Sequence, residues 1–497
     1  MQVRTLSRSR TADVLILSSG SFLTALVSIL SGVVLTRLLT QANFGTYRQA
    51  GLAMSFAVPL VMMGLDRALF TFLPGEQERP RAVLVENLLL LLAAGGALTL
   101  FAMIGGGRLL ARRFDNPALA PLLSWFAAYA LFYVPATAVS GCLLARQQTR
   151  TLAAYNVISR LMNFLAVVSL VWFWRKPAAA LVGVLIGTAI NCVAGVWLMW
   201  RACPGVEWRP SREGMGRQLA FAVPLGLSSL VGSLGQSLDQ MVVSLRCTPA
   251  QFAVYTVGAM EVPLVGMITG SITSVVMVDY ARLYRQGRVG EIVRLVQLAM
   301  SRSALILLPA MTLLWVVAPA LMRLLYGPSY AGAALPFRIY LLLLPVRTLT
   351  FGAVIQTTGS SRPMLVQSII GLALTATSGW LLAGWLGPAG AAAASVSVTL
   401  LFTVPFLLLV LMRRLRQPAV TIFPWAVLAR TLAASLVAGS AAYLVTAWGW
   451  PGKAATLPLA VAVFVPVVGC LLVRLGVADW AMIRRLLGGF APCQAGG

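Results

Sequence analysis

The sequence predicts an all-α polytopic membrane protein with about 14 transmembrane helices, built as two parallel six-helix repeats followed by two further helices. Three observations lead to this class. Apolar residues make up 59% of the 497 residues and charged residues only 10%, whereas a soluble domain keeps about a quarter of its residues charged. Apolar runs of helix length recur from end to end, and a short motif occurs twice. The mean hydropathy of +0.87 agrees with a chain that lies in lipid.

The apolar runs set the number of helices, because a helix needs about 20 apolar residues to cross about 30 Å of hydrocarbon. Spans are expected at 14–36, 49–66, 83–105, 119–144, 152–173, 178–200, 219–243, 252–277, 296–319, 333–357, 364–386, 389–411, 422–446 and 455–475. They occupy nearly the whole chain and leave no room for an extramembrane domain. The first run is too long for the core of a cleaved secretory signal, so we expect it to be the first spanning helix.

The net charge of +25 predicts the orientation of the helices. With the N-terminus inside, more than half of the 38 Lys and Arg residues fall in the predicted inner segments, and such a bias is typical of the cytoplasmic side. Both termini are therefore expected in the cytoplasm. No basic stretch is interleaved with stacking aromatic residues, so nucleic acid is not an expected partner.

A repeated motif indicates two homologous halves. The stretch "TQANFGTY" at 40–47 returns as "TPAQFAVY" at 248–255, and "VPLV" occurs at 58–61 and again at 262–265. Both repeated segments lie at the matching helix of a six-helix unit. The longer one follows an odd-numbered helix each time. The halves therefore share one orientation and are related by an axis along the membrane normal. Repeats of this kind are typical of transporters, which place the substrate path where the repeats meet.

The repeat also predicts the domains. In chain order these are an N-terminal six-helix lobe (1–200), a cytoplasmic linker (201–218), a C-terminal six-helix lobe (219–411), two additional helices (412–475) and a cytoplasmic tail (476–497). The linker is the longest polar stretch and is rich in Arg and Pro. It could be an ordinary surface loop or have a regulatory role.

Several stretches resemble the polysaccharide (O-antigen type) flippases of the multidrug/oligosaccharidyl-lipid/polysaccharide exporter superfamily. They are "LTRLLTQANFGTYRQ" after the first helix, "LLYGPSYAGAALPFRIYLLLLP" at the ninth and tenth, and "TTGSSRP" before the eleventh. Most of the resemblance is carried by Arg37, Leu39, Phe44, Gly45 and Tyr47. The resemblance covers most of the chain and implies two lobes in a V shape. It implies a bacterial inner-membrane protein that moves undecaprenyl-diphosphate-linked oligosaccharide from the inner to the outer leaflet, by alternating access with ion coupling.

The partners that the resemblance implies are the lipid-linked glycan, the lipid bilayer, and polysaccharide polymerase and export proteins, with a monomer as the default. Two alternatives stay open. One is another exporter of the superfamily, either a lipid II flippase or a cation-coupled drug exporter, although a drug exporter would need an acidic cavity. The other is a glycan polymerase or ligase, which usually has a long outer loop, whereas the predicted outer loops are short.

No cofactor, metal site or catalytic residue is expected, and the protein is not expected to be an enzyme. The chain has no histidine, which excludes histidine-based triads and proton relays. The six cysteines are scattered without paired spacing, so we expect free thiols that fill space, with neither a disulfide framework nor a metal site. No phosphate-binding glycine loop begins a nucleotide-binding unit.

Four arginines within predicted helices are the candidates for a cationic substrate path: Arg160, Arg338, Arg347 and Arg302. Ionisable residues are costly in a membrane and by default indicate function. Arginine suits a diphosphate because its planar fork binds phosphate oxygens bidentately and keeps its charge. The alternative is that an arginine near a helix end reaches the lipid headgroups, which fits Arg302 better than Arg160 or Arg347.

Polar residues share one face of the seventh predicted helix, 219–243, at helical spacing. The corresponding positions of the first helix are serines, so the two helices are expected to line a cavity between the lobes. The cavity-lining candidates are Ser28, Ser31, Ser233, Gln236 and Gln240. Asp239 lies beside this face. Small residues also serve close helix packing, and that alternative stays open for the serines.

Two carboxylates are the candidates for an ion-coupling site. Glu261 lies in the middle of the eighth predicted helix, just before Val262 and Pro263, and Asp239 lies in the seventh. A carboxylate in the membrane must be protonated, paired or hydrated. Glu261 could exchange an ion as the lobes move, or it could form a buried pair with an arginine that only ties helices together.

Overall fold

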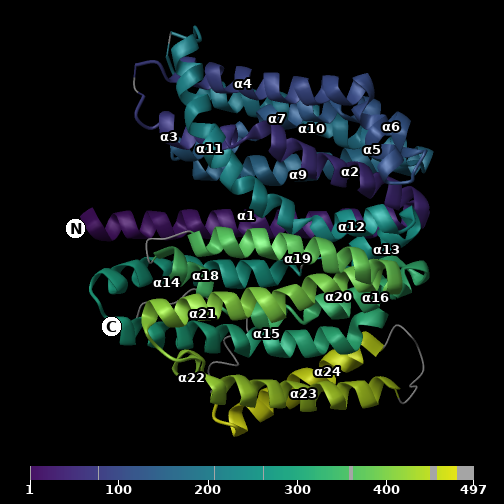
Figure 1. Ribbon diagram of the computed structural model, residues 1–497, viewed down its shortest axis with the longest axis vertical. Helices are drawn as coiled ribbons and strands as arrows, with labels where there is room; N and C mark the ends of the chain where they lie inside the picture. Colours follow the sequence, from purple (N-terminus) through teal and green to yellow (C-terminus); the bar gives the residue numbers. More distant parts are fainter. Residues whose placement is uncertain are drawn as a thin grey trace. The chain divides into compact units, whose positions relative to one another are not determined.

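The computed structural model describes residues 2–76, 78–205, 207–260, 262–357, 362–447 and 456–477. Within these ranges the regular structure is helical throughout and includes no strand (Figure 1). This confirms the predicted all-α class. A helix satisfies its backbone hydrogen bonds internally, as a segment surrounded by hydrocarbon must.

The described residues contain ten helices that are long and apolar enough to cross a membrane, or up to 12 if each of two bent pairs is one span. The bent pairs are Gln41–Met62 with Leu65–Phe72, and Pro328–Leu341 with Leu344–Thr357. All of these segments coincide with predicted apolar runs. The protein is therefore a multi-pass membrane protein.

The two remaining predicted spans are each interrupted. Residues 219–243 fall on α11 (Arg212–Gln236) and α12 (Leu238–Arg246), because the backbone leaves helical geometry at Ser237 (φ −122°, ψ 10°). Residues 252–277 fall on α13 (Pro249–Gly258) and α14 (Pro263–Arg285). Proline has no N–H to donate and is tolerated only in the first turn of a helix, so Pro263 starts α14 and cannot continue α13.

The chain divides into two compact units, Met1–Val257 with Ser368–Ser395, and Gly258–Gln367 with Val396–Gly497. The predicted domain boundaries come from the sequence repeat, whereas these two units are defined by how compactly their residues pack. The predicted domains therefore stay a prediction. The first unit is formed by α1 (Gln2–Leu38), α2 (Gln41–Met62), α3 (Leu65–Phe72), α4 (Pro80–Phe101), the π-helix η1 (Ala102–Gly106), α5 (Gly107–Arg113), α6 (Leu119–Phe126), α7 (Ala128–Ala136), α8 (Ala138–Ala145), α9 (Thr149–Trp174), α10 (Pro177–Ala202), α11, α12, nearly all of α13, and most of α19 (Arg362–Leu386) and α20 (Pro388–Val398).

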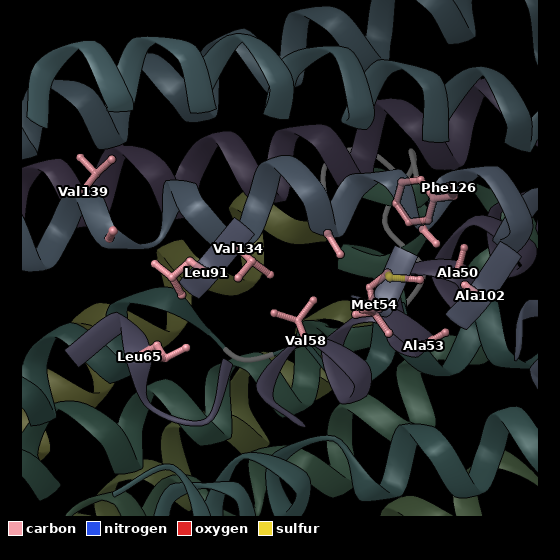
Figure 2. Close-up of a cluster of buried hydrophobic side chains, with 14 of the residues drawn as sticks. Ala50, Ala53, Met54, Val58, Leu65, Leu91, Ala102, Phe126, Val134 and Val139 are labelled. Atoms are coloured by element: carbon pink, nitrogen blue, oxygen red, sulfur yellow. The ribbon is translucent and has the colours of Figure 1, made fainter. Parts of the chain in front are cut away.

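The core of the first unit lies between α2, α3, α4, α6 and α7. Figure 2 shows Val58 of α2 together with Leu65, Leu91 and Val134, and all four are at most 5% exposed. The helices approach closely where one of them offers a small residue, as membrane helices commonly do. A Cβ atom on Gly95 of α4 would lie 2.6 Å from a backbone oxygen of α7.

The second unit is built around α15 (Val289–Tyr326), a helix of 38 residues. One apolar cluster joins α15 to α14, α18 and α21, and another joins it to α23 and α24. The other elements of this unit are the 3-10 helix η2 (Pro328–Ala333), α16 (Ala334–Leu341), α17 (Leu344–Arg347), α18 (Phe351–Thr357), the π-helix η3 (Thr399–Thr403), α21 (Val404–Leu415), α22 (Ala419–Ile422), α23 (Trp425–Ala447) and α24 (Thr456–Arg474).

The predicted linker is fastened to the start of α4. The Nε atom of Arg81 donates to the carbonyl of Cys203 (2.9 Å). Glu86, which is 3% exposed, accepts from both the backbone N–H and the hydroxyl of Ser211 (2.9 Å each). The same Ser211 hydroxyl accepts from the N–H of Gly214 and so caps the start of α11. A buried carboxylate thus fixes where α11 begins.

The repeated motif forms the same local structure twice. The Thr40 hydroxyl accepts from the N–H three residues later (3.3 Å) and caps α2, and the Thr248 hydroxyl does the same at α13 (3.3 Å). In each copy the phenylalanine four residues after the threonine is buried, Phe44 at 4% and Phe252 at 0% exposure. Each motif therefore encodes a capped helix start with an aromatic anchor, which supports the interpretation as a repeat.

The two capped ends meet at Gly45. A Cβ atom on Gly45 would lie 1.8 Å from the carbonyl oxygen of Pro249, the first residue of α13. No side chain fits at this distance, so glycine is required for the close approach.

We expect Gly45→Ala to lower the stability of the detergent-purified protein, since forcing extra atoms into a packed contact costs about 1–3 kcal/mol. Gly51→Ala is the matched control on the same helix, because a Cβ there meets nothing within 4 Å. That change should leave the apparent melting temperature unchanged or raise it. Equal melting temperatures for the two variants would show that the Gly45 contact is not tight.

Candidate substrate path in the membrane

Arg160 pairs with a residue of the predicted cavity face. Its Nε atom donates to the Ser28 hydroxyl (2.9 Å), which joins α9 to α1. The Ser28 hydroxyl in turn donates to the carbonyl of Thr24 (2.7 Å). Arg160 is exposed and Ser28 is half-buried. The hydrogen bond therefore orients the guanidinium while the side chain stays accessible to a ligand.

Aromatic residues of α6 and α7 lie near Arg160, and the sequence analysis did not single them out. The rings of Tyr129 and Tyr133 stack at 4.9 Å, and Phe126 stacks on Tyr129 at 5.3 Å. Arg160 interacts electrostatically with the hydroxyls of Tyr47, Tyr129 and Tyr133. The spacing of i, i+3 and i+7 at 126, 129 and 133 is a signal that could have indicated one shared face.

Arg338 lies in the wall of an apolar pocket in the second unit. The pocket encloses about 630 Å³ between α15, α16 and α23. Arg338 donates through Nε to the carbonyl of Trp315 (2.9 Å), and its guanidinium lies 6.0 Å from the centre of that indole ring. Most of the other lining side chains are apolar, among them Leu342, Leu436 and Leu444. The pocket thus combines an apolar cavity with one cation.

The other two candidate arginines, Arg302 on α15 and Arg347 on α17, are exposed. Arg338 and Arg347 do not share one straight helix, because α16 ends at Leu341 and the two segments meet at 43°. Arg160 belongs to the first unit, and the other three candidates belong to the second. Their roles as a shared cationic path stay a prediction.

The polar face predicted on the seventh helix is divided between two helices. Ser233, half-buried, and Gln236, exposed, lie on α11, whereas Asp239 and Gln240, both half-buried, lie on α12 beyond the break at Ser237. The Ser233 hydroxyl donates to the carbonyl of Leu230 (3.0 Å). The corresponding serine on α1, Ser31, is half-buried.

One of the two candidate coupling carboxylates has a defined partner. The hydroxyl of Tyr255, which is fully buried, donates to Oδ2 of Asp239 (2.6 Å). Tyr255 is the last residue of the second motif, and Tyr47 is its counterpart in the first. The repeat thus ends each time in a tyrosine that lies near polar groups. Glu261, the other candidate, lies outside the described residues.

A buried hydrogen-bond network joins α2 to α12. Asn116 Nδ2 donates to Gln49 Oε1 (2.6 Å) and to the Thr46 hydroxyl (3.0 Å). Gln49 Nε2 donates to the hydroxyl of Ser244 on α12 (3.1 Å). All four residues are at most 6% exposed. This network could not be predicted from the sequence, because partners so far apart in the chain leave no spacing to recognise.

Asn116 also lines a second cavity, of about 590 Å³, in the first unit. Its other polar lining residues are Arg108, Arg112, Asp115 and Ser124. Arg108 and Arg112 both lie on α5.

Comparisons with known proteins agree with this arrangement. The family model for polysaccharide biosynthesis proteins matches residues 34–335, which is more than half of the chain. The chain belongs to this family. A search among curated proteins gives no match.

Solved structures show the same fold. The chain is similar to the lipid II flippase MurJ in an inward closed conformation, with a TM-score of 0.67, 14% identity, and coverage of 93% of this chain and 99% of that one. It is also similar to an inward-facing multidrug resistance MATE family transporter of the MOP superfamily (TM-score 0.62, 16% identity, coverage 82% and 99%). A third match is a MOP superfamily transporter from Pyrococcus furiosus (TM-score 0.55, 17% identity, coverage 82% and 96%). The protein therefore has the MOP transporter fold.

We expect Tyr255→Phe to lower the apparent melting temperature, because it leaves the Asp239 carboxyl without its 2.6 Å hydrogen bond. A hydrogen bond of this kind contributes about 0.5–1.5 kcal/mol to stability. Tyr47→Phe, at the equivalent position of the first repeat, is the control. If both variants have the same apparent melting temperature as the parent protein, the Tyr255–Asp239 hydrogen bond contributes nothing to stability.

Proposed function

We propose that the protein flips undecaprenyl-diphosphate-linked oligosaccharide units from the inner to the outer leaflet of the bacterial inner membrane, for polysaccharide export. The observation that carries this proposal is the apolar pocket with Arg338 in its wall. The substrate joins an apolar prenyl chain to a diphosphate, so a pocket for it needs an apolar cavity next to a cation. Membership of the polysaccharide biosynthesis family and the MOP transporter fold support the same class.

The charge of the substrate explains why arginines lie within membrane helices. A diphosphate cannot cross hydrocarbon without its water, so the protein must supply replacement donors along the path. Arg160 is exposed, and it is held at Nε by Ser28 (2.9 Å). The rest of its fork can bind phosphate oxygens, and the nearby tyrosine hydroxyls add further donors.

Ion coupling is proposed for the carboxylates of the second repeat. Asp239 lies just after the break between α11 and α12. Glu261 comes two residues before Pro263 in the sequence. Discontinuous helices are where transporters commonly bind coupling ions, since the break exposes backbone groups. A carboxyl in such a place can take up a proton or cation on one side and release it on the other.

The alternatives within the superfamily differ in the headgroup that they move. Similarity to a structure of a lipid II flippase keeps another lipid-linked substrate as the second candidate. A cation-coupled drug exporter fits less well, because the charged candidates near the two described sites are mainly arginines. Both termini in the cytoplasm, a monomeric state, and contact with polymerase and export proteins are part of the proposal.

Removing the cation of the apolar pocket should impair export. In cells that depend on the protein for surface polysaccharide, we expect Arg338→Ala to reduce export roughly tenfold or more, because a hydrogen bond to a charged group contributes about 1.5–3 kcal/mol. Arg160→Ala should act in the same direction. Lysine at either position should restore part of the activity, since it returns the charge but not the fork.

The matched control is Arg323→Ala, which removes an exposed arginine in the last turn of α15 away from the pocket. Export is measured as surface glycan per unit of protein in the membrane. Normal export by Arg338→Ala and Arg160→Ala at parental protein levels would contradict the diphosphate-binding role of these residues.

Glu261→Gln separates ion coupling from a structural role, because glutamine keeps the shape of the side chain but cannot titrate. We expect a stable variant that exports poorly and whose residual rate does not respond to collapse of the proton gradient. Surface glycan is measured with and without a protonophore. A variant that exports at the parental rate, and still responds to the collapse, would remove Glu261 from the mechanism.

A further inference from the structure

Two of the scattered cysteines meet in the first unit. Cys142 on α8 and Cys203, the residue after α10, are 61 positions apart in the chain, yet their sulfur atoms lie 3.6 Å apart. Both side chains are 0% exposed. Both are free thiols, as expected, and their closeness had no signal in the spacing of the cysteines along the sequence.

Positive charge surrounds the pair. Arg146 lies one helical turn after Cys142, and its Nε and Nη2 atoms are buried without a hydrogen-bond partner in the described part of the chain. A buried guanidinium in this state is costly unless an anion lies beside it. Arg81 donates to the Cys203 carbonyl from the other side (2.9 Å), with its guanidinium 4.8 Å from the centre of the Trp200 ring.

These neighbours favour a thiolate at Cys203. A hydrogen bond from the Cys142 thiol lowers the pKa of the Cys203 thiol, and Arg146 and Arg81 lower it further, whereas burial opposes them. A thiolate at Cys203 would supply the anion that Nε and Nη2 of Arg146 lack. A thiolate next to arginines and a second thiol is the arrangement found in reactive cysteine pairs.

We propose that Cys142 and Cys203 form a redox-active dithiol, which oxidation closes to a disulfide between α8 and the start of the linker. To form the bond, the sulfurs must approach from 3.6 Å to about 2.05 Å. A bond here would tie α8 covalently to a linker that is already fastened to α4 through the Cys203 carbonyl.

The reaction balances with a diazene oxidant such as diamide. The Cys203 thiolate adds to one nitrogen of the N=N bond, and the other nitrogen takes a proton. The Cys142 sulfur, after losing its proton, attacks the Cys203 sulfur and forms the S–S bond as the S–N bond breaks. The two electrons and two protons end on the hydrazine product. A low-molecular-weight disulfide would act in the same way by thiol–disulfide exchange.

The test counts reactive thiols in the full-length protein in membrane vesicles. After diamide treatment the protein is denatured and labelled with a maleimide polymer that adds a fixed mass to each thiol. We expect the parent protein to lose two labels and to regain them after dithiothreitol. Cys142→Ser and Cys203→Ser should lose none, whereas Cys192→Ser, which changes a cysteine within α10, should still lose two. Arg146→Gln should slow the loss several-fold.

Peptide mapping of the oxidised parent protein keeps the test independent of the variants, and a linked Cys142–Cys203 peptide is the expected product. The proposal is overturned if the parent protein keeps all its labels, or if mapping finds a different pair. It is equally overturned if Cys142→Ser loses two labels as readily as the parent protein. None of these outcomes depends on whether the protein transports a glycan.

Discussion

Hydrocarbon offers no hydrogen-bond partners, and this constraint governs the rest of the structure. It selects helices for the backbone, and it requires every polar side chain within them to find a partner in the protein. Arg160 finds Ser28, Tyr255 finds Asp239, and Asn116 finds Gln49, each across two different elements. These pairs are therefore structural ties as well as candidate functional groups. Where a polar group keeps an exposed side, as Arg160 does, it can exchange its partner for a ligand.

The need of polar groups for partners within the protein also applies where the two repeats meet. The two capped helix starts meet where Gly45 packs on the backbone of Pro249, and a buried hydrogen bond joins Gln49 to Ser244 nearby. A transporter that works by alternating access must loosen such contacts between its repeats and form them again. The breaks at Ser237 and before Pro263 occur in the same two predicted spans that carry the candidate coupling acids.

Much of the fold could be predicted from the sequence, because apolar length and helix spacing are local properties. The all-helical class and the ten to 12 candidate spans of the described residues follow from the apolar runs. The break at Ser237 could not be predicted, since the residues around it are compatible with a continuous helix. The break before α14 had a signal in the sequence, because Pro263 favours the start of a helix over its interior.

The candidate site was less predictable, because its pairs form between residues distant in the chain. The sequence singled out Arg160 and Ser28 but not their contact. It gave no sign of the Gln49–Asn116–Ser244 network or of the approach of Cys142 to Cys203. Glu86 is a similar case, since only the folded chain brings Ser211 to its carboxylate. The cost of placing a polar group in the membrane indicates which residues are functional candidates. It does not indicate which other residues contact them.

Reconstitution of the purified protein tests the central claim of lipid-linked glycan flipping most directly. Proteoliposomes would carry a fluorescent short-chain prenyl diphosphate glycan, and a membrane-impermeant quencher would report the fraction in the outer leaflet over time. We expect the protein to accelerate transbilayer movement of this lipid. It should not accelerate movement of a zwitterionic phospholipid with the same fluorophore, because that lipid lacks the diphosphate and the glycan. Equal rates with and without the protein, or equal acceleration of both lipids, would contradict the proposed function.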